Sequence, residues 1–288
     1  MLRFFLFCLL VPLAQPVLAQ PFPDRQETPL AQHGQTARTI WEVMQLDALA
    51  PILRDEALAQ AAEMADTMFP RGGTGRWLDR VGAIHQPDRF RALFLRGLAE
   101  ALPNTDPEDL RAGLAFYRTG LGRQLLALEE AARRAMLDDN TEAAARAAWA
   151  QARAQASPRA ARIARLIEAG GLIDANVAGG MNASLAFARG FQAGGGFLMP
   201  MAESQMIAEA WAEEPRIRAD TESWIGAYLF LAYTPLSDAQ LDLYTIYAGS
   251  DGGRALSGVM FAGFDAFLTR ASRDLGIAAA AELRGRQL

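Results

Sequence analysis

The sequence predicts an all-α protein, and three observations lead to this fold class. Apolar residues recur at intervals of three and four along most of the chain, which is the spacing of one face of an α-helix. Prolines, glycines and capping residues divide this pattern into segments of helical length. No segment shows sustained alternation of apolar and polar residues, and β-branched residues are sparse.

The N-terminus has the layout of a secretory signal peptide. Arg3 supplies the positive charge, Phe4 to Leu13 form a short apolar run, and Ala19 ends a small-residue cleavage pattern. The apolar run is about half of the ~20 residues that a membrane-spanning helix needs. We therefore expect residues 1–19 to be removed and the mature protein to be secreted and periplasmic. Peripheral association with a membrane is compatible with this interpretation, whereas a spanning helix in the mature chain is not.

The composition of the mature chain excludes several kinds of chemistry. Cys8 is the only cysteine and lies in the expected signal peptide, and the 28 basic residues are all arginine. We therefore expect no thiolate nucleophile, cysteine metal site, Schiff-base lysine or phosphate-loop lysine. The formal net charge of −5 argues against nucleic-acid binding, which depends on clustered basic side chains. We expect no cofactor and no nucleic-acid partner.

The first elements follow from breaks in the apolar pattern. Residues 20–37 are rich in proline and polar residues without a helical period, so we expect a flexible N-terminal arm. Residues 38–69 carry an apolar stripe at helical spacing, with Pro51 at a position tolerated in a first turn. A short helix ending near His85 follows a glycine-rich segment. A further helix is expected over the apolar stripe of residues 90–102.

The stretch of residues 106–125 is predicted to form a helix, a tight break and the start of a second helix. Asp106 can cap the first helix, and the proline after it fits the first helical position, where its missing N–H costs nothing. This helix ends near Gly120, because glycine reaches left-handed backbone angles easily. The second, long helix is expected to continue to about Ala156, with a kink at residues 138–140.

The second half of the chain begins at Ser157, which precedes another first-turn proline. Residues 177–201 are rich in glycine, alanine and methionine, and such small residues let helices approach closely. We expect a buried helix here. Further helices are predicted to begin near Pro200 and Pro215. A short helix with a capping box then begins at Ser237, and a last apolar helix follows it.

The second half repeats the helix-break-helix unit with an offset of 131 residues. The matching pairs are Leu110 with Leu241, Phe116 with Tyr247, Thr119 with Ser250, Gly122 with Gly253, Arg123 with Arg254, and Leu125 with Leu256. We therefore predict an internal duplication that forms two tandem related helical bundles. Helical repeat 1 would span residues 38–156 and helical repeat 2 residues 157–288.

Both units resemble a motif of the bacterial domain-of-unknown-function family 2059, written L-x-x-x-x-x-F-Y-x-S/T-x-x-G-x-x-L. The first copy matches it at Leu110, Phe116, Tyr117, Thr119, Gly122 and Leu125. The second copy matches it at Leu241, Tyr247, Ser250, Gly253 and Leu256. Ala248 stands where the second tyrosine would be, which argues against one shared chemical role for Tyr117 and its counterpart. The resemblance implies an exported, all-helical protein and brings no activity with it.

The motif residues form the candidate interaction or structural site. They are Phe116, Tyr117, Gly122, Arg123, Tyr247, Gly253 and Arg254. We expect the glycines to permit close chain approach and the aromatic rings to pack between helices. The arginines are less expected, because the dipole at a helix N-terminus disfavours a cation. An ion pair to a neighbouring acid, or contact with a bound anion or carboxylate, would explain them.

The leading functional hypothesis is an exported, non-catalytic binding or scaffold module of the cell envelope. Its partner would be an unknown protein or a small amphipathic ligand. One alternative is a peripheral membrane or lipid-binding protein with an apolar groove between the repeats. Another is a carboxylate- or metal-dependent hydrolase, for which acids are offered by Glu129, Glu130, Asp138 and Asp139. Because solvated helices commonly carry such acids, we lean against an enzyme and predict neither catalytic nor metal-binding residues.

Overall fold

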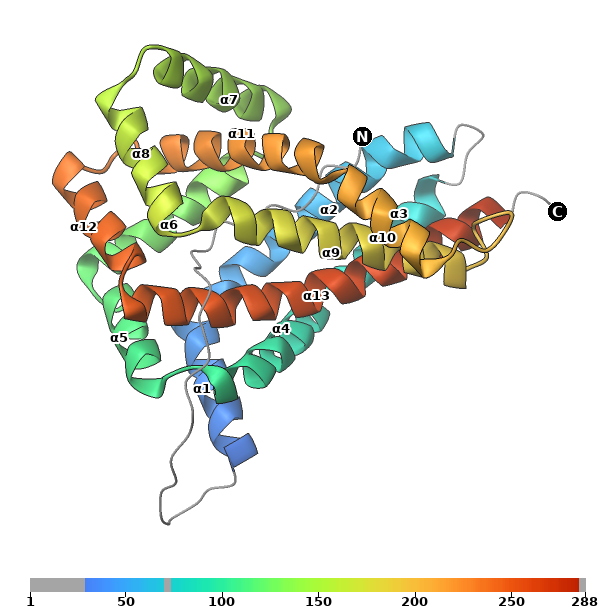
Figure 1. Cartoon of the computed structure of the whole chain (residues 1–288), viewed down its shortest axis with the longest axis horizontal. Coiled ribbons are helices and arrows are strands. Elements are labelled where there is room, and N and C mark those ends of the chain that lie inside the picture. The colour runs from blue at the N-terminus through green and yellow to red at the C-terminus, as the bar shows by residue number, and fades with distance from the viewer. Residues whose placement is uncertain (1–28, 70–73, 285–288) are drawn as a thin grey trace.

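The computed structural model describes residues 29–69 and 74–284, and within these ranges the chain is helical without a β-strand (Figure 1). This confirms the all-α prediction. The expected signal peptide lies outside the described residues. The helices of the first half are α1 (Pro29–Val43), α2 (Leu46–Met68), α3 (Thr74–Ile84), α4 (Pro87–Ala101), the 3-10 helix η1 (Leu102–Asn104), α5 (Pro107–Tyr117), α6 (Gly120–Ala135) and α7 (Asp139–Ala154). Those of the second half are α8 (Pro158–Ala169), α9 (Leu172–Ala193), α10 (Glu203–Ala212), α11 (Glu214–Ala232), α12 (Asp238–Ala248) and α13 (Asp251–Arg284).

Side-chain caps determine where the two short motif helices begin. Asp106 precedes α5 and accepts hydrogen bonds from the backbone N–H groups of Glu108 (2.8 Å) and Asp109 (3.1 Å). Ser237 precedes α12 and forms a reciprocal capping box with Gln240. These bonds satisfy amides of the first helical turn, which have no partner within the helix.

Three helix boundaries differ from the sequence-based expectation. α1 begins at Pro29 and not at Arg38, since proline is tolerated at a first helical position, so the helix includes part of the expected arm. A break at Gln45, whose backbone is left-handed (φ 54°), separates α1 from α2 and places Pro51 inside α2. The expected kink in the long helix is a complete break, because the Asp138 side chain caps α7.

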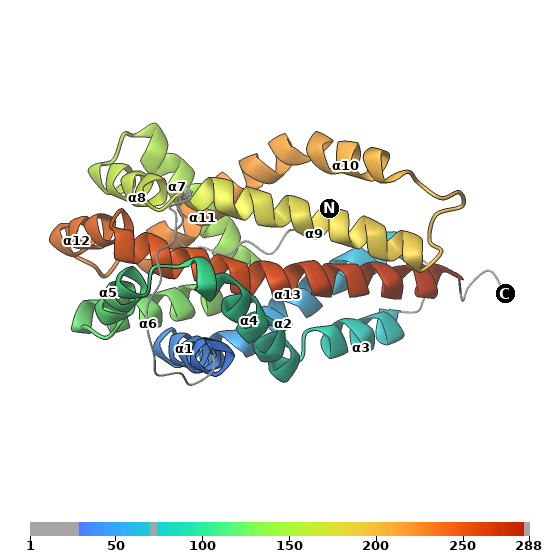
Figure 2. The ribbon, with the colours of Figure 1, turned by 60° about the horizontal axis from the view of Figure 1, so that its bottom comes forward.

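The longest helix, α13, has 34 residues and runs through the centre of the molecule. Figures 1 and 2 show α9 beside it on one side and α4 on the other. Glycines bring α9 and α13 together: a Cβ added at Gly190 would lie 2.7 Å from the carbonyl carbon of Arg273. A Cβ added at Gly276 would lie 2.6 Å from the amide nitrogen of Phe191. The small-residue segment thus forms a helix that packs closely on α13.

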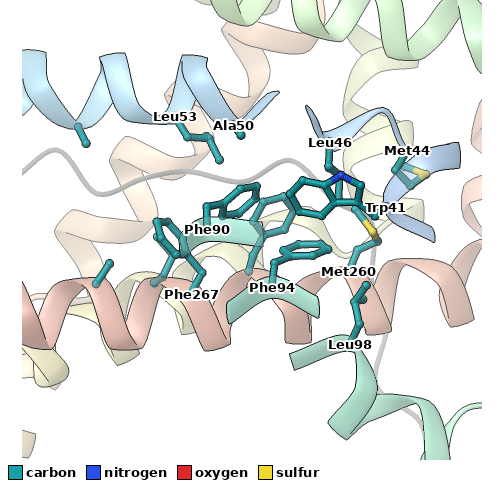
Figure 3. Packing of buried hydrophobic residues seen from close by; sticks show 14 of the residues in the cluster. Trp41, Met44, Leu46, Ala50, Leu53, Phe90, Phe94, Leu98, Met260 and Phe267 are labelled. Carbon is teal, nitrogen blue, oxygen red and sulfur yellow. The ribbon is translucent and has the colours of Figure 1, made fainter. Parts of the chain in front are cut away.

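Two hydrophobic cores stabilise the molecule. The α13 core joins residues of α1 to α6 with α13, and Figure 3 shows Trp41, Phe90 and Phe94 gathered with Phe267 of α13. The rings of Phe90 and Phe267 meet edge to face, with centroids 4.9 Å apart. The α11 core joins α6, α7 and α8 with α11 and α12.

The two halves of the chain therefore do not form separate bundles, contrary to the expected division at residue 156. α13 belongs to the second half but packs against α4 and α5. In turn, α6 and α7 of the first half pack against α11. The apolar period of a helix shows which face is buried, but it does not show which helix covers that face.

Candidate functional site

The two helix-break-helix units meet at a pair of stacked aromatic rings. Phe116 of α5 and Tyr247 of α12 lie with their ring centroids 3.7 Å apart and their planes at 8°. Both rings pack against both hydrophobic cores. The Tyr247 hydroxyl also donates a hydrogen bond to the Gly113 carbonyl (3.1 Å). The aromatic residues of the motif thus connect the α13 core with the α11 core.

The breaks in the two units contain the same hydrogen bonds. Thr119 Oγ1 accepts from the Gly122 N–H (3.1 Å) and donates to the Phe116 carbonyl (2.7 Å). Ser250 makes the two equivalent bonds in the second unit, at 3.1 and 2.6 Å. Each hydroxyl therefore satisfies the end of one helix and the beginning of the next.

The motif glycines stand where the chain packs against its own preceding turn. A Cβ added at Gly122 would lie 2.5 Å from the Cα of Tyr117 and would overlap the Phe116 carbonyl oxygen. A Cβ added at Gly253 would overlap the Tyr247 carbonyl oxygen. Since the obstructing atoms belong to the backbone, a larger residue would displace the helix that carries it.

Arg123 and Arg254 make equivalent contacts with the helix before them. Nη1 of Arg123 donates to the carbonyl of Arg118, and Nη1 of Arg254 donates to the carbonyl of Gly249. These carbonyls lie at the ends of α5 and α12, where the helix dipole is negative and carbonyls lack intrahelical partners. Arg254 also forms an ion pair with Asp251. The preceding helix end therefore accounts for both cations without a bound ligand.

The five tyrosines of the chain form one connected cluster with Glu129 of α6. Tyr233 donates a hydrogen bond to Glu129 Oε1 (2.6 Å), and Tyr228 donates to the Glu129 backbone carbonyl (3.0 Å). Tyr244 also hydrogen-bonds the Glu129 carboxylate and shares a hydroxyl–hydroxyl bond with Tyr117 (3.2 Å). The fifth tyrosine is the one in the stacked pair. The motif tyrosines Tyr117 and Tyr247 thus belong to the same side-chain cluster as the Glu129 carboxylate.

Burial dominates the electrostatics of this cluster. It raises the pKa of Glu129 to about 7, although the hydrogen bonds from Tyr233 and Tyr244 oppose the rise. Burial also raises the pKa of Tyr117, Tyr233 and Tyr244 well above the usual value of a phenol. These tyrosines therefore act as neutral hydrogen-bond donors, while Glu129 titrates near neutral pH.

Within the described ranges, Glu129 forms no ion pair, although arginines are close to it in sequence. Arg133 makes a bidentate pair with Glu56, with N···O distances of 2.7 and 2.8 Å. Arg134 pairs with Glu130 at 2.8 Å. Both guanidiniums thus already have a carboxylate, and the charge of Glu129 is left without a counter-ion.

Glu129 lines a pocket of about 70 Å³ between the two cores, which we call the Glu129 pocket. Side chains of the α13 core supply its apolar wall: Met44, Leu46, Leu126, Met260 and Phe264. Figure 3 shows Met44, Leu46 and Met260 at one end of that core. The polar side of the pocket comes from α6 and α11, through Glu129, Glu130, Arg133 and Tyr228. The site therefore combines a half-buried acid with an apolar surface.

Of the other acids named from the sequence, Glu130 lines this pocket, whereas Asp138 and Asp139 do not. Asp138 is the cap of α7 and accepts from the N–H (2.8 Å) and hydroxyl (2.9 Å) of Thr141. No group of three His, Cys, Asp or Glu in the described part of the chain is arranged to hold a metal ion. His85 is buried with Nδ1 2.9 Å from the Val81 carbonyl, and burial lowers its pKa to about 4.

Sequence reasoning placed Glu129 among exposed acids and missed its position. A signal was present in the spacing. Leu125 and Leu126 are buried one turn before Glu129, and Ala132 and Arg133 are buried one turn after it. Residues three and four apart share one helix face, so Glu129 belongs to the buried side of α6.

A family comparison supports the resemblance over the first unit. The model of a family described as an uncharacterized protein conserved in bacteria (DUF2059) matches residues 88–151, from the first turn of α4 to the last turn of α7. The match includes one copy of the motif; the second unit is not matched, so the prediction of two family copies holds only for the first. No curated protein and no solved structure matches the chain.

Proposed function

We propose that this chain is an exported, non-catalytic binding module of the bacterial cell envelope, with the Glu129 pocket as its ligand site. The observation that carries the proposal is a buried carboxylate without a cationic partner, on a residue that lines a pocket where two cores meet. Burying such a group lowers the stability of a fold. Binding of a ligand that compensates the charge would explain why a destabilising residue is present at this position.

The surroundings of Glu129 favour binding over catalysis. Burial raises the pKa of Tyr233 and Tyr244, so their hydroxyls stay protonated at neutral pH and act as hydrogen-bond donors and not as phenolate bases. The motif residues Gly122 and Arg123 take part in contacts between helix ends. These observations support a module whose polar residues hold a shape and present one charge.

We also propose that the chain arose by internal duplication. Helix α12 has the bounds of α5 displaced by 131 residues, and the same displacement relates the first residues of α6 and α13. It also relates the last residues of α4 and α11. In this proposal α13 corresponds to α6 and α7 joined into one helix, and the stacked pair of Phe116 and Tyr247 joins equivalent residues.

Export and binding can be tested separately. The protein recovered from the periplasm of an expressing bacterium should begin at Gln20; retention of residues 1–19 in the cytoplasm would contradict export. The mature chain is then screened by thermal unfolding against small amphipathic amines, alcohols and carboxylates. We expect at least one to raise Tm in the wild type and in the control Glu100→Gln, whose acid lies outside the pocket, but not in Glu129→Gln. If none does, the pocket is not a ligand site.

Membrane attachment is a second candidate, favoured by an exposed apolar surface away from the pocket. Leu198 and Met199 in the loop before α10 are 98% and 80% exposed, and Trp211 of α10 is 63% exposed. Figure 2 shows α10 on the outside of α9. In the described part of the chain no helix is long and apolar enough to cross a membrane. Flotation with neutral phosphatidylcholine vesicles, lost in L198S/M199S and kept in Glu129→Gln, would support this candidate.

A further inference from the structure

We propose that the Glu129 pocket binds a primary alkylammonium group, supplied by a small free amine or by a lysine side chain of another protein. This inference rests on the proposed function and names the chemistry of the ligand. The chain contains no lysine, so such a group comes from another molecule.

Charge is the first reason for a cation. The pocket and its ion-paired neighbours contain three carboxylates and two guanidiniums: Glu56, Glu129, Glu130, Arg133 and Arg134. Each guanidinium is already held by a carboxylate other than Glu129. A cation would neutralise the remaining charge, whereas an anionic ligand would add a second uncompensated charge to a site that already disfavours one.

Hydrogen bonding and the apolar wall suit an ammonium at the end of an alkyl chain. The pocket of about 70 Å³ has room for a –CH₂–NH₃⁺ group. Oε1 of Glu129 accepts from Tyr233, and the carboxylate keeps further lone pairs with which to accept from a cation. An ammonium needs a single acceptor oxygen. The alkyl stem has an apolar surface to cover in Met260 and Phe264.

The binding is expected to depend on pH, because Glu129 must be ionised to hold a cation. Its pKa of about 7 means that the ionised fraction falls about tenfold from pH 8 to pH 6. The other titratable or charged groups that face it are Tyr228, Tyr233, Tyr244, Glu130, Arg133 and Glu56. Burial raises the pKa of Tyr233 and Tyr244, so these phenols stay neutral in this range, and Glu56, Glu130 and Arg133 are held in ion pairs. Glu129 therefore sets the profile.

The test is calorimetric titration of the mature full-length chain with n-propylamine, with 1-propanol as a neutral control of similar size. We expect saturable binding of the amine only, about tenfold weaker at pH 6 than at pH 8. Glu129→Gln should abolish the binding. Glu100→Gln, which removes an acid paired with Arg96 outside the pocket, should retain it. If Glu129→Gln does not fold, the pH dependence of amine binding by the wild type still tests whether binding requires ionised Glu129.

The same titration separates the sources and the two proposals. If Nα-acetyl-lysine amide binds more tightly than propylamine, the natural ligand is a lysine side chain; if it binds equally or more weakly, the ligand is a free amine. The Nε-acetylated form of the lysine compound lacks the ammonium group and should not bind. If an alcohol or a carboxylate binds and the amine does not, the ammonium inference is wrong while the pocket remains a ligand site. Amine binding that is indifferent to both pH and Glu129→Gln also overturns the inference.

Discussion

Replacing Glu129 by glutamine is expected to stabilise the protein above neutral pH. The two side chains have nearly the same size, and the glutamine carbonyl oxygen can accept the Tyr233 hydrogen bond that Glu129 Oε1 accepts. The substitution thus removes the charge and retains the contact. The expected gain is unusual, because most changes at buried positions destabilise a protein.

The magnitude follows from proton linkage. Burial raises the pKa of Glu129 from 4.5 to about 7, so between these values the folded state holds more protons than the unfolded state. The free energy of unfolding of the wild type therefore falls as pH rises through this window. The complete difference is about 3 kcal/mol, and most of it is lost between pH 5 and pH 8. The glutamine variant lacks this loss, so its stability relative to the wild type should increase by about 2–3 kcal/mol over that range.

Urea unfolding at pH 5 and pH 8, followed by circular dichroism, measures this quantity. Glu130→Gln is the matched control: Glu130 pairs with Arg134 in an i, i+4 surface contact, and its loss should have an effect of under about 0.5 kcal/mol at both pH values. A Glu129→Gln variant that is less stable than the wild type at pH 8, or that differs from it equally at both pH values, would refute the reasoning. Ionised Glu129 would then make favourable contacts in the folded state.

Three further predictions concern the motif. Gly122→Ala should lower the free energy of unfolding by about 2–3 kcal/mol, because its Cβ would overlap backbone atoms. In the control Gly120→Ala the added Cβ meets nothing within 4 Å, so the change should be under about 1 kcal/mol. Thermal melts of the two variants measure the difference. Arg123→Gln should lower stability by about 0.3–1 kcal/mol in low salt and by less in 1 M salt; a salt-independent loss contradicts the helix-end contact. A double-mutant cycle of Phe116→Leu and Tyr247→Leu should give a coupling of about 0.5–1.5 kcal/mol, and additive effects would show that the stacking contributes nothing.

Local features of the fold were accessible from the sequence because their causes lie within a few residues. Asp106 and Ser237 cap α5 and α12 through hydrogen bonds to amides two or three positions away. Thr119 and Ser250 make the breaks through contacts of the same range. Residue type and spacing determine such bonds, so the beginnings of these helices could be predicted.

The arrangement of the helices and the site itself depend on contacts that no local pattern contains. The hydroxyl of Tyr233 that holds Glu129 is 104 positions from it, and the hydroxyls of Tyr117 and Tyr244 are 127 positions apart. α13 carries apolar residues on several faces, because it packs against α9 as well as α4 and α5. Such a helix can pack against helices of either half of the chain. Its position between the two halves therefore could not be predicted from the sequence and is seen only in the structure.

Glu129 and Gly122 show why the sign of a stability change separates a binding residue from a structural one. Gly122 meets backbone atoms of its own unit, so a change there should reduce stability without any reference to a ligand. Glu129 lowers the stability of the folded state whenever it is ionised, so its removal should increase stability and abolish ligand binding. Residues that reduce stability persist where a function needs them. Opposite effects on stability and on amine binding in the single variant Glu129→Gln are therefore the result that a ligand site at this carboxylate requires.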